Sequence, residues 1–71
     1  MNVRTVAIQL NGEARRVRAG LDLARLLEEL GLDRRLVVVE HNREIMDRAR
    51  LEGVEVREGD SIELVHFVGG G

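Results

Sequence analysis

Hydrophobic and polar residues alternate at the start of the chain, which is the pattern of a half-buried β-strand. Asn11-Gly12 follows this segment, and both residue types tolerate the positive φ angles of a type I′ hairpin turn. Residues 13–18 are then expected to return as an edge strand, because their apolar pattern is weaker. In the first strand the apolar positions are Val6, Ile8 and Leu10.

After residue 20 the hydrophobic period changes to that of a helix. Four leucines recur at spacings of three and four residues, so they share one helical face. Asp22 precedes them as an N-cap, and Gly31 follows as a residue that takes the left-handed conformation with ease. The pattern predicts a helix over about residues 22–30. Its apolar face consists of Leu23, Leu26, Leu27 and Leu30.

Shorter elements are predicted in the second half of the chain. The continuous apolar run 36–39 is typical of an interior strand that is covered on both faces or nearly so. Residues 45–46 are expected to form a short strand and residues 47–51 a single helical turn. The alternating segment 61–68 is predicted to be the last strand.

The predicted element order is β-β-α-β-β-β, which indicates an α+β fold. We expect a mixed sheet of four to five strands with one main helix packed on one face. If the first and last strands lie side by side at the centre, the arrangement is the β-grasp of ubiquitin. Residues 1–71 are expected to form a single domain.

Composition and charge exclude several classes of function. The formal net charge is −2, and no basic excess is available to hold a nucleic-acid backbone. The absence of cysteine and lysine excludes disulfides, thiol nucleophiles and Schiff-base chemistry. No apolar run is long enough to span a membrane, and no signal pattern is present, so we expect a cytoplasmic protein.

The sequence contains no arrangement of residues typical of catalysis. It has no glycine-rich phosphate-binding motif, and Ser61 is its only serine. His41 and His66 are expected to be turn and strand residues, because two isolated histidines form neither a metal site nor a triad. We therefore expect no catalytic residue and no bound metal.

Three glycines directly after the last apolar strand are the most informative feature of the sequence. Glycine has no Cβ, so Gly69, Gly70 and Gly71 are able to enter a channel that is too narrow for side chains. Three extended residues reach roughly 10 Å. Once a partner activates it, the Gly71 carboxylate becomes an electrophile on a flexible arm. The alternative is a frayed chain end without function.

Alternation along the last strand places two further apolar side chains beside this tail. If Ile62 and Leu64 face the helix, Val65 and Phe67 lie on the open side of the sheet. Together with Val68 they are expected to form a surface that binds partner proteins. The alternative is that Phe67 folds over an edge of the core.

Six short segments, in a fixed order along the chain, carry a family resemblance. They are Asn11-Gly12-Glu13, Leu23-Ala24-Arg25-Leu26-Leu27, Gly31-Leu32, Val37-Val38-Val39-Glu40-His41-Asn42, Gly59-Asp60-Ser61-Ile62-Glu63-Leu64 and Phe67-Val68-Gly69-Gly70-Gly71. Over nearly its whole length the chain thereby resembles the ThiS family of ubiquitin-like sulfur carriers of thiamine biosynthesis. The Asn42-Arg43 turn departs from the Asn-Gly that is common in the family, but Asn42 tolerates positive φ.

The resemblance implies a carrier, not an enzyme, with no bound cofactor. A ubiquitin-activating-type adenylyltransferase would use ATP and Mg²⁺ to convert the Gly71 carboxylate to an acyl-adenylate. A persulfide donor such as a cysteine desulfurase would indirectly supply sulfur to form a thiocarboxylate, and thiazole synthase would consume it. The alternatives are a sister carrier for tRNA thiolation or molybdopterin synthesis, or a β-grasp interaction module without sulfur chemistry.

Overall fold

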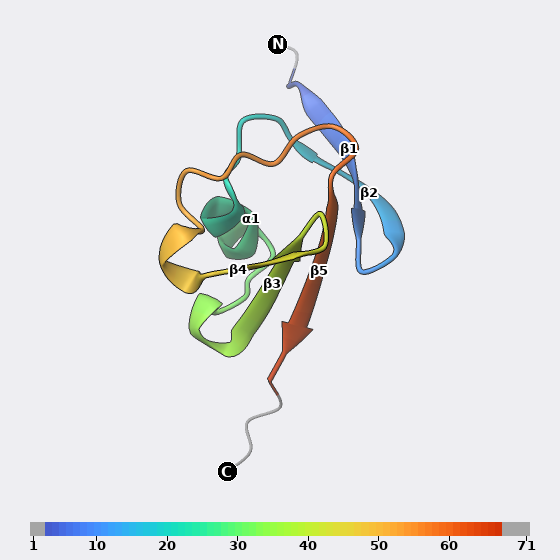
Figure 1. Cartoon of the computed structure of the whole chain (residues 1–71). Helices are drawn as coiled ribbons and strands as arrows, with labels where there is room; N and C mark the ends of the chain where they lie inside the picture. Colours follow the sequence, from blue (N-terminus) through green and yellow to red (C-terminus); the bar gives the residue numbers. More distant parts are fainter. Residues whose placement is uncertain (1–2, 68–71) are drawn as a thin grey trace.

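A five-stranded mixed sheet with one α-helix on one face forms the molecule (Figure 1). The computed structural model describes residues 3–67. The strand order is β2-β1-β5-β3-β4, in which β1 and β5 are parallel neighbours and the other pairs are antiparallel. The strands are β1 (Thr5–Leu10), β2 (Glu13–Arg18), β3 (Val37–His41), β4 (Glu44–Met46) and β5 (Ser61–His66).

This topology confirms the α+β class and the β-grasp arrangement, with the first and last strands adjacent at the centre of the sheet. The first hairpin forms as predicted, because Asn11 and Gly12 both adopt positive φ, at 51° and 81°. β2 lies at one edge of the sheet. Within the described residues, no helix has the length and apolar character needed to cross a membrane.

The helix α1 (Leu23–Glu29) begins and ends where its capping residues predict. The Asp22 side chain accepts a hydrogen bond of 2.8 Å from the Arg25 backbone N–H, which satisfies one of the free amides of the first turn. After the C-cap, Leu30, the chain leaves the helix through Gly31 at φ 74°.

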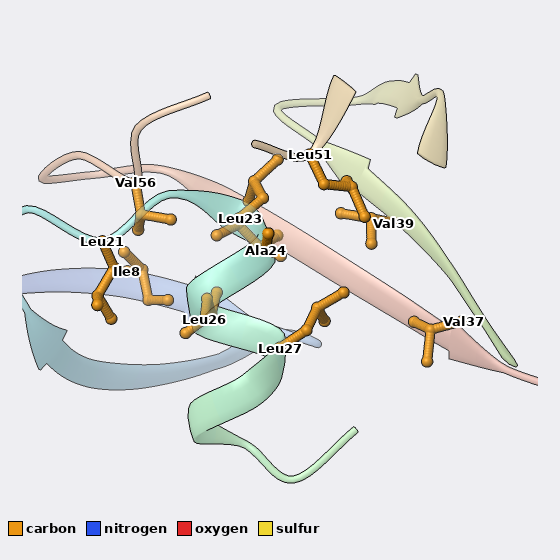
Figure 2. Close-up of a cluster of buried hydrophobic side chains, with 11 residues drawn as sticks. Ile8, Leu21, Leu23, Ala24, Leu26, Leu27, Val37, Val39, Leu51 and Val56 are labelled. Carbon is orange, nitrogen blue, oxygen red and sulfur yellow. The ribbon is translucent and has the colours of Figure 1, made fainter. Parts of the chain in front are cut away.

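The core lies between α1 and the face of the sheet that the helix covers (Figure 2). Leu23, Leu26 and Leu27 are each about 1% exposed, which confirms the predicted helical face. The long connection from β4 to β5 completes the core with Leu51 and Val56, which lie close to the helix in Figure 2. A short 3-10 turn, Arg48–Arg50, lies within the segment 47–51 that was expected to be helical.

The prediction that residues 36–39 form an interior strand, covered on both faces or nearly so, is wrong at its first residue, and the second face is only partly covered. Leu36 belongs to a 3-10 turn (Arg34–Leu36) that the sequence reading missed, so the strand begins at Val37. Val37 and Val39 are buried, but Val38 is only half-buried, because the helix packs on one face of the sheet. The β3 strand is therefore interior within the sheet but covered on one face.

The last strand is shorter than the predicted segment 61–68. β5 ends at His66, Phe67 follows it outside the strand, and Val68 lies outside the described residues.

The turn between β3 and β4 keeps the hairpin geometry despite its unusual second residue. Asn42 and Arg43 adopt φ angles of 50° and 71°. Asn tolerates this region, whereas an arginine pays a steric cost of about 1–2 kcal/mol there because its Cβ approaches the backbone.

We predict that Arg43→Gly raises the free energy of unfolding by about 0.5–1 kcal/mol, because relief of this strain exceeds the added entropy of the unfolded chain. Urea denaturation of both proteins measures the change. Gly12→Ala is the converse control. Gly12 has φ 81° and open space around the position of an added Cβ, so no side-chain clash arises, and the change in stability combines backbone strain with the lower entropy of the unfolded chain. A lower stability of Arg43→Gly would contradict the strain argument.

Candidate functional site

The candidate site is the carboxyl end of β5, the central strand that leads toward the glycine tail. Val65 and Phe67 are 60% and 47% exposed, whereas Ile62 is fully buried and Leu64 half-buried. The predicted alternation is therefore confirmed, and Phe67 does not fold into the core. The other predicted site residues, Val68 and Gly69 to Gly71, lie outside the described residues.

Hydrogen bonds hold this end of β5 in place from two sides. The Phe67 N–H donates to the Leu36 carbonyl at 2.8 Å. On the other side, the Leu64 N–H donates to the Asn11 side-chain oxygen at 2.7 Å. The segment that precedes residue 68 is thus positioned by β3 and by the tip of the first hairpin.

Apolar residues of two further segments lie on the same side of the sheet as Val65, opposite α1. Register places Val38 opposite Val65, and Ile45 opposite Glu40. Ile45 is 71% exposed, and Leu36 is also exposed beside Phe67, to which it is hydrogen-bonded. We call the side chains of Val38, Ile45, Val65 and Phe67 the open face. Residues 45–46 were predicted to form a short strand, but Ile45 was not assigned to this surface. Its alternation with Met46 would have placed the two side chains on opposite faces of the sheet.

The open face also carries negative charge. Glu40 and Glu63 lie directly opposite each other on β3 and β5. Among the described residues, no ion pair involves either carboxylate. Like charges directly opposite each other destabilise a sheet.

Comparison with known proteins agrees with this fold. The model of the ThiS family matches residues 8–71, nearly the whole chain. The chain belongs to the ThiS family. The resemblance first based on short motifs is thereby confirmed.

Individual relatives of this ThiS-family chain agree with that assignment. The sulfur carrier protein ThiS of Bacillus subtilis strain 168 is 48% identical over 46 residues, which are 65% of this chain and 70% of that protein. A crystal structure of the thiamine biosynthesis protein ThiS from Geobacter metallireducens superposes with a TM-score of 0.77 at 31% identity. That superposition covers 93% of this chain and all of the other.

Longer proteins also contain a similar segment. The thiazole synthase of Paramagnetospirillum magneticum strain AMB-1 is 45% identical over 62 residues, which are 87% of this chain. That of Magnetococcus marinus strain MC-1 is 44% identical over 64 residues, 90% of this chain. The ThiS-family chain spans only 19% and 20% of these two relatives.

A polar cluster that the sequence reading missed connects the β3–β4 turn to the loop before β5. His41, the last residue of β3, lies with its Nε2 2.8 Å from Asp60 Oδ2. Asn42 Nδ2 donates to Asp60 Oδ1 at 3.2 Å, and the Arg57 N–H donates to Asp60 Oδ2 at 2.9 Å. No local signal could predict this cluster, because 19 residues separate His41 from Asp60.

The Asp60 cluster has a structural role. The Asp60 side chain is mostly buried, and each of its oxygens accepts at least one hydrogen bond. Burial raises the pKa of Asp60, but the hydrogen bonds from His41, from the Arg57 N–H and from Asn42 outweigh burial, so its pKa lies below the usual 3.8. Ionised Asp60 therefore stabilises the fold at neutral pH, and this contribution is lost as the pH falls through its folded-state pKa.

We predict that Asp60→Asn lowers the free energy of unfolding at pH 7 by about 1–3 kcal/mol, because a buried network loses its charged acceptor. The variant should also lose less stability than the wild type when the pH falls from 7 to below 3.8. Urea denaturation across this range measures both effects. Glu13→Gln, on the exposed edge strand, is the matched control. Equal acid sensitivity of Asp60→Asn and wild type would refute the role of Asp60.

Proposed function

We propose that this chain is a sulfur carrier that delivers sulfur for the thiazole ring of thiamine. The observation that carries the proposal is family membership over residues 8–71, combined with an exposed apolar strand end that leads directly to Gly69, Gly70 and Gly71. The names of its relatives point to thiamine biosynthesis, which favours this pathway over tRNA thiolation or molybdopterin synthesis.

The chemistry is proposed to occur at the Gly71 carboxylate. An adenylyltransferase partner joins this carboxylate to the α-phosphate of ATP with the help of Mg²⁺, and pyrophosphate leaves. A persulfide sulfur, derived from a cysteine desulfurase or a similar donor, then attacks the acyl carbon and displaces AMP. A thiol reductant breaks the remaining S–S bond, and a thiocarboxylate stays on Gly71.

In this proposal the carrier contributes no catalytic group. It supplies the acyl carbon, a glycine tail without side chains and a surface for docking, while the partners supply nucleotide binding and acid–base chemistry. Val65, Phe67 and Val68 form the docking surface for the adenylyltransferase and for thiazole synthase. The exposure of Val65 and Phe67 supports this role, because exposed apolar side chains clustered on one face favour contact with a partner.

We predict that a variant lacking Gly71 cannot be loaded with sulfur. The test incubates each protein with the cognate adenylyltransferase, ATP, Mg²⁺ and a persulfide donor, followed by intact mass measurement. The full chain should gain the mass of one oxygen-to-sulfur exchange, and a reaction without ATP should show no gain. If the truncated variant also gained this mass, Gly71 would not be the modified residue.

We predict that Phe67→Glu weakens binding to the adenylyltransferase and to thiazole synthase by about tenfold or more, because an aromatic contact is replaced by a desolvated carboxylate. Its urea midpoint should change little, since Phe67 is exposed. Val3→Glu is the matched control, because Val3 is a large exposed apolar residue that lies before β1. Unchanged affinity of Phe67→Glu would exclude this face as the docking surface.

A further inference from the structure

The backbone of β5 presents its hydrogen-bonding groups alternately to its two neighbours. The Asn42 N–H donates to the Ser61 carbonyl, and the Phe67 N–H donates to the Leu36 carbonyl. In an antiparallel pair, the residues between these two positions alternate in direction. Residues 61, 63, 65 and 67 therefore direct their backbone groups toward β3, and residues 62, 64 and 66 direct theirs away from it.

On the side away from β3, the partners of β5 end before the strand does. β1 pairs with β5 only at Ser61 and Ile62, and the Asn11 N–H then donates to the Ile62 carbonyl at 2.9 Å. Because the chain turns back at Asn11-Gly12, the Asn11 side chain replaces the next strand carbonyl and accepts from the Leu64 N–H. Figure 1 shows β5 continuing past the tip of this hairpin.

The next groups along this edge are the Leu64 carbonyl and the His66 N–H. Within residues 3–67 no hydrogen bond is made to either group on this side. His66, at the end of this strand, is an exposed residue. A strand edge of this kind is a template for pairing with an added strand.

We propose that an extended segment of thiazole synthase adds to this edge of β5 as a further strand. The segment accepts a hydrogen bond from the His66 N–H and donates one to the Leu64 carbonyl, which is the β-augmentation mode of recognition. This inference rests on the proposed function, because the edge precedes the tail that the synthase must take. An added strand would fix the direction in which Gly69 to Gly71 leave the carrier.

Two observations identify the chemistry of this occupant. Val65 and Phe67, the residues before and after His66, expose their side chains on the open face beside this edge. A side chain of the added strand that points to the open face should therefore be apolar. The two thiazole synthases that contain a segment similar to this chain have about four-fifths of their length outside it. That remainder is the source of the added strand.

The first test compares His66→Pro with His66→Ala. Both variants remove the imidazole, but only proline removes the backbone N–H of residue 66. That N–H faces away from β3, where no described strand pairs with it. Affinity for thiazole synthase should be about tenfold lower for His66→Pro than for His66→Ala. Val65→Pro is the control for folding damage, because the Val65 N–H is directed at β3. Of the three variants, only Val65→Pro should lower the urea midpoint markedly. Equal affinities of the two His66 variants would overturn the proposal.

Amide hydrogen exchange of the wild-type carrier tests the proposal even if His66→Pro does not fold. The His66 amide should exchange rapidly in the free protein and at least tenfold more slowly when thiazole synthase is bound, whereas the Glu63 amide is slow in both states. Rapid exchange at His66 in the complex would overturn the proposal. Protection that appears with rising carrier concentration alone would also overturn it, because a second copy of the carrier would then occupy the edge.

The outcomes separate this inference from the proposed function. If Gly71 is loaded with sulfur and the synthase consumes it while His66 stays unprotected, the carrier function stands and the strand addition is wrong. If Gly71 is never loaded, the proposed function fails whatever the exchange at His66.

Discussion

One short helix covers only one face of a five-stranded sheet, and the rest of the molecule depends on this constraint. With seven residues, α1 is only about 10 Å long. It buries Leu23, Leu26 and Leu27 completely, but other segments must fill the core around it. Leu51 and Val56 of the long connection do so. The opposite face keeps its apolar side chains exposed, which makes it available for partner binding.

The central strand β5 joins the stability of the fold to the proposed function. Its inward side chain Ile62 is fully buried, while its outward side chain Val65 is exposed. The strand is held by β3 along its length, but by β1 only at its beginning. Its carboxyl end is thus anchored as far as Phe67 and still leaves the Leu64 carbonyl and the His66 N–H without a partner among the described residues. Substitutions on its outward side are therefore expected to affect binding more than folding.

Asn11 shows how one residue serves both local and long-range structure. Its positive φ forms the first hairpin turn, and its side-chain oxygen continues the pairing of β5 where the strand β1 has ended. The second hairpin turn has Arg43 where a glycine would be favoured, and Arg43 adopts the left-handed conformation. That turn is connected to the body of the protein through Asn42 and His41, both of which contact Asp60.

The elements whose signals are local could be predicted from the amino-acid sequence. The alternation over β1 and β5, the leucine face of α1 and the Asn-Gly turn all depend on residues fewer than eight positions apart, so the pattern carries them. The orientation of Val65 and Phe67 followed from the same alternation.

The folded arrangement was needed to establish which surfaces are covered and which backbone groups find partners. The partial exposure of Val38 depends on how much of the sheet a single helix covers. A run of valines in the sequence does not indicate which of them that helix covers. The contact of His41 with Asp60 and the unused edge at His66 depend on strand order and on where β1 turns back. These features arise from residues far apart in the chain, and only folding brings them together.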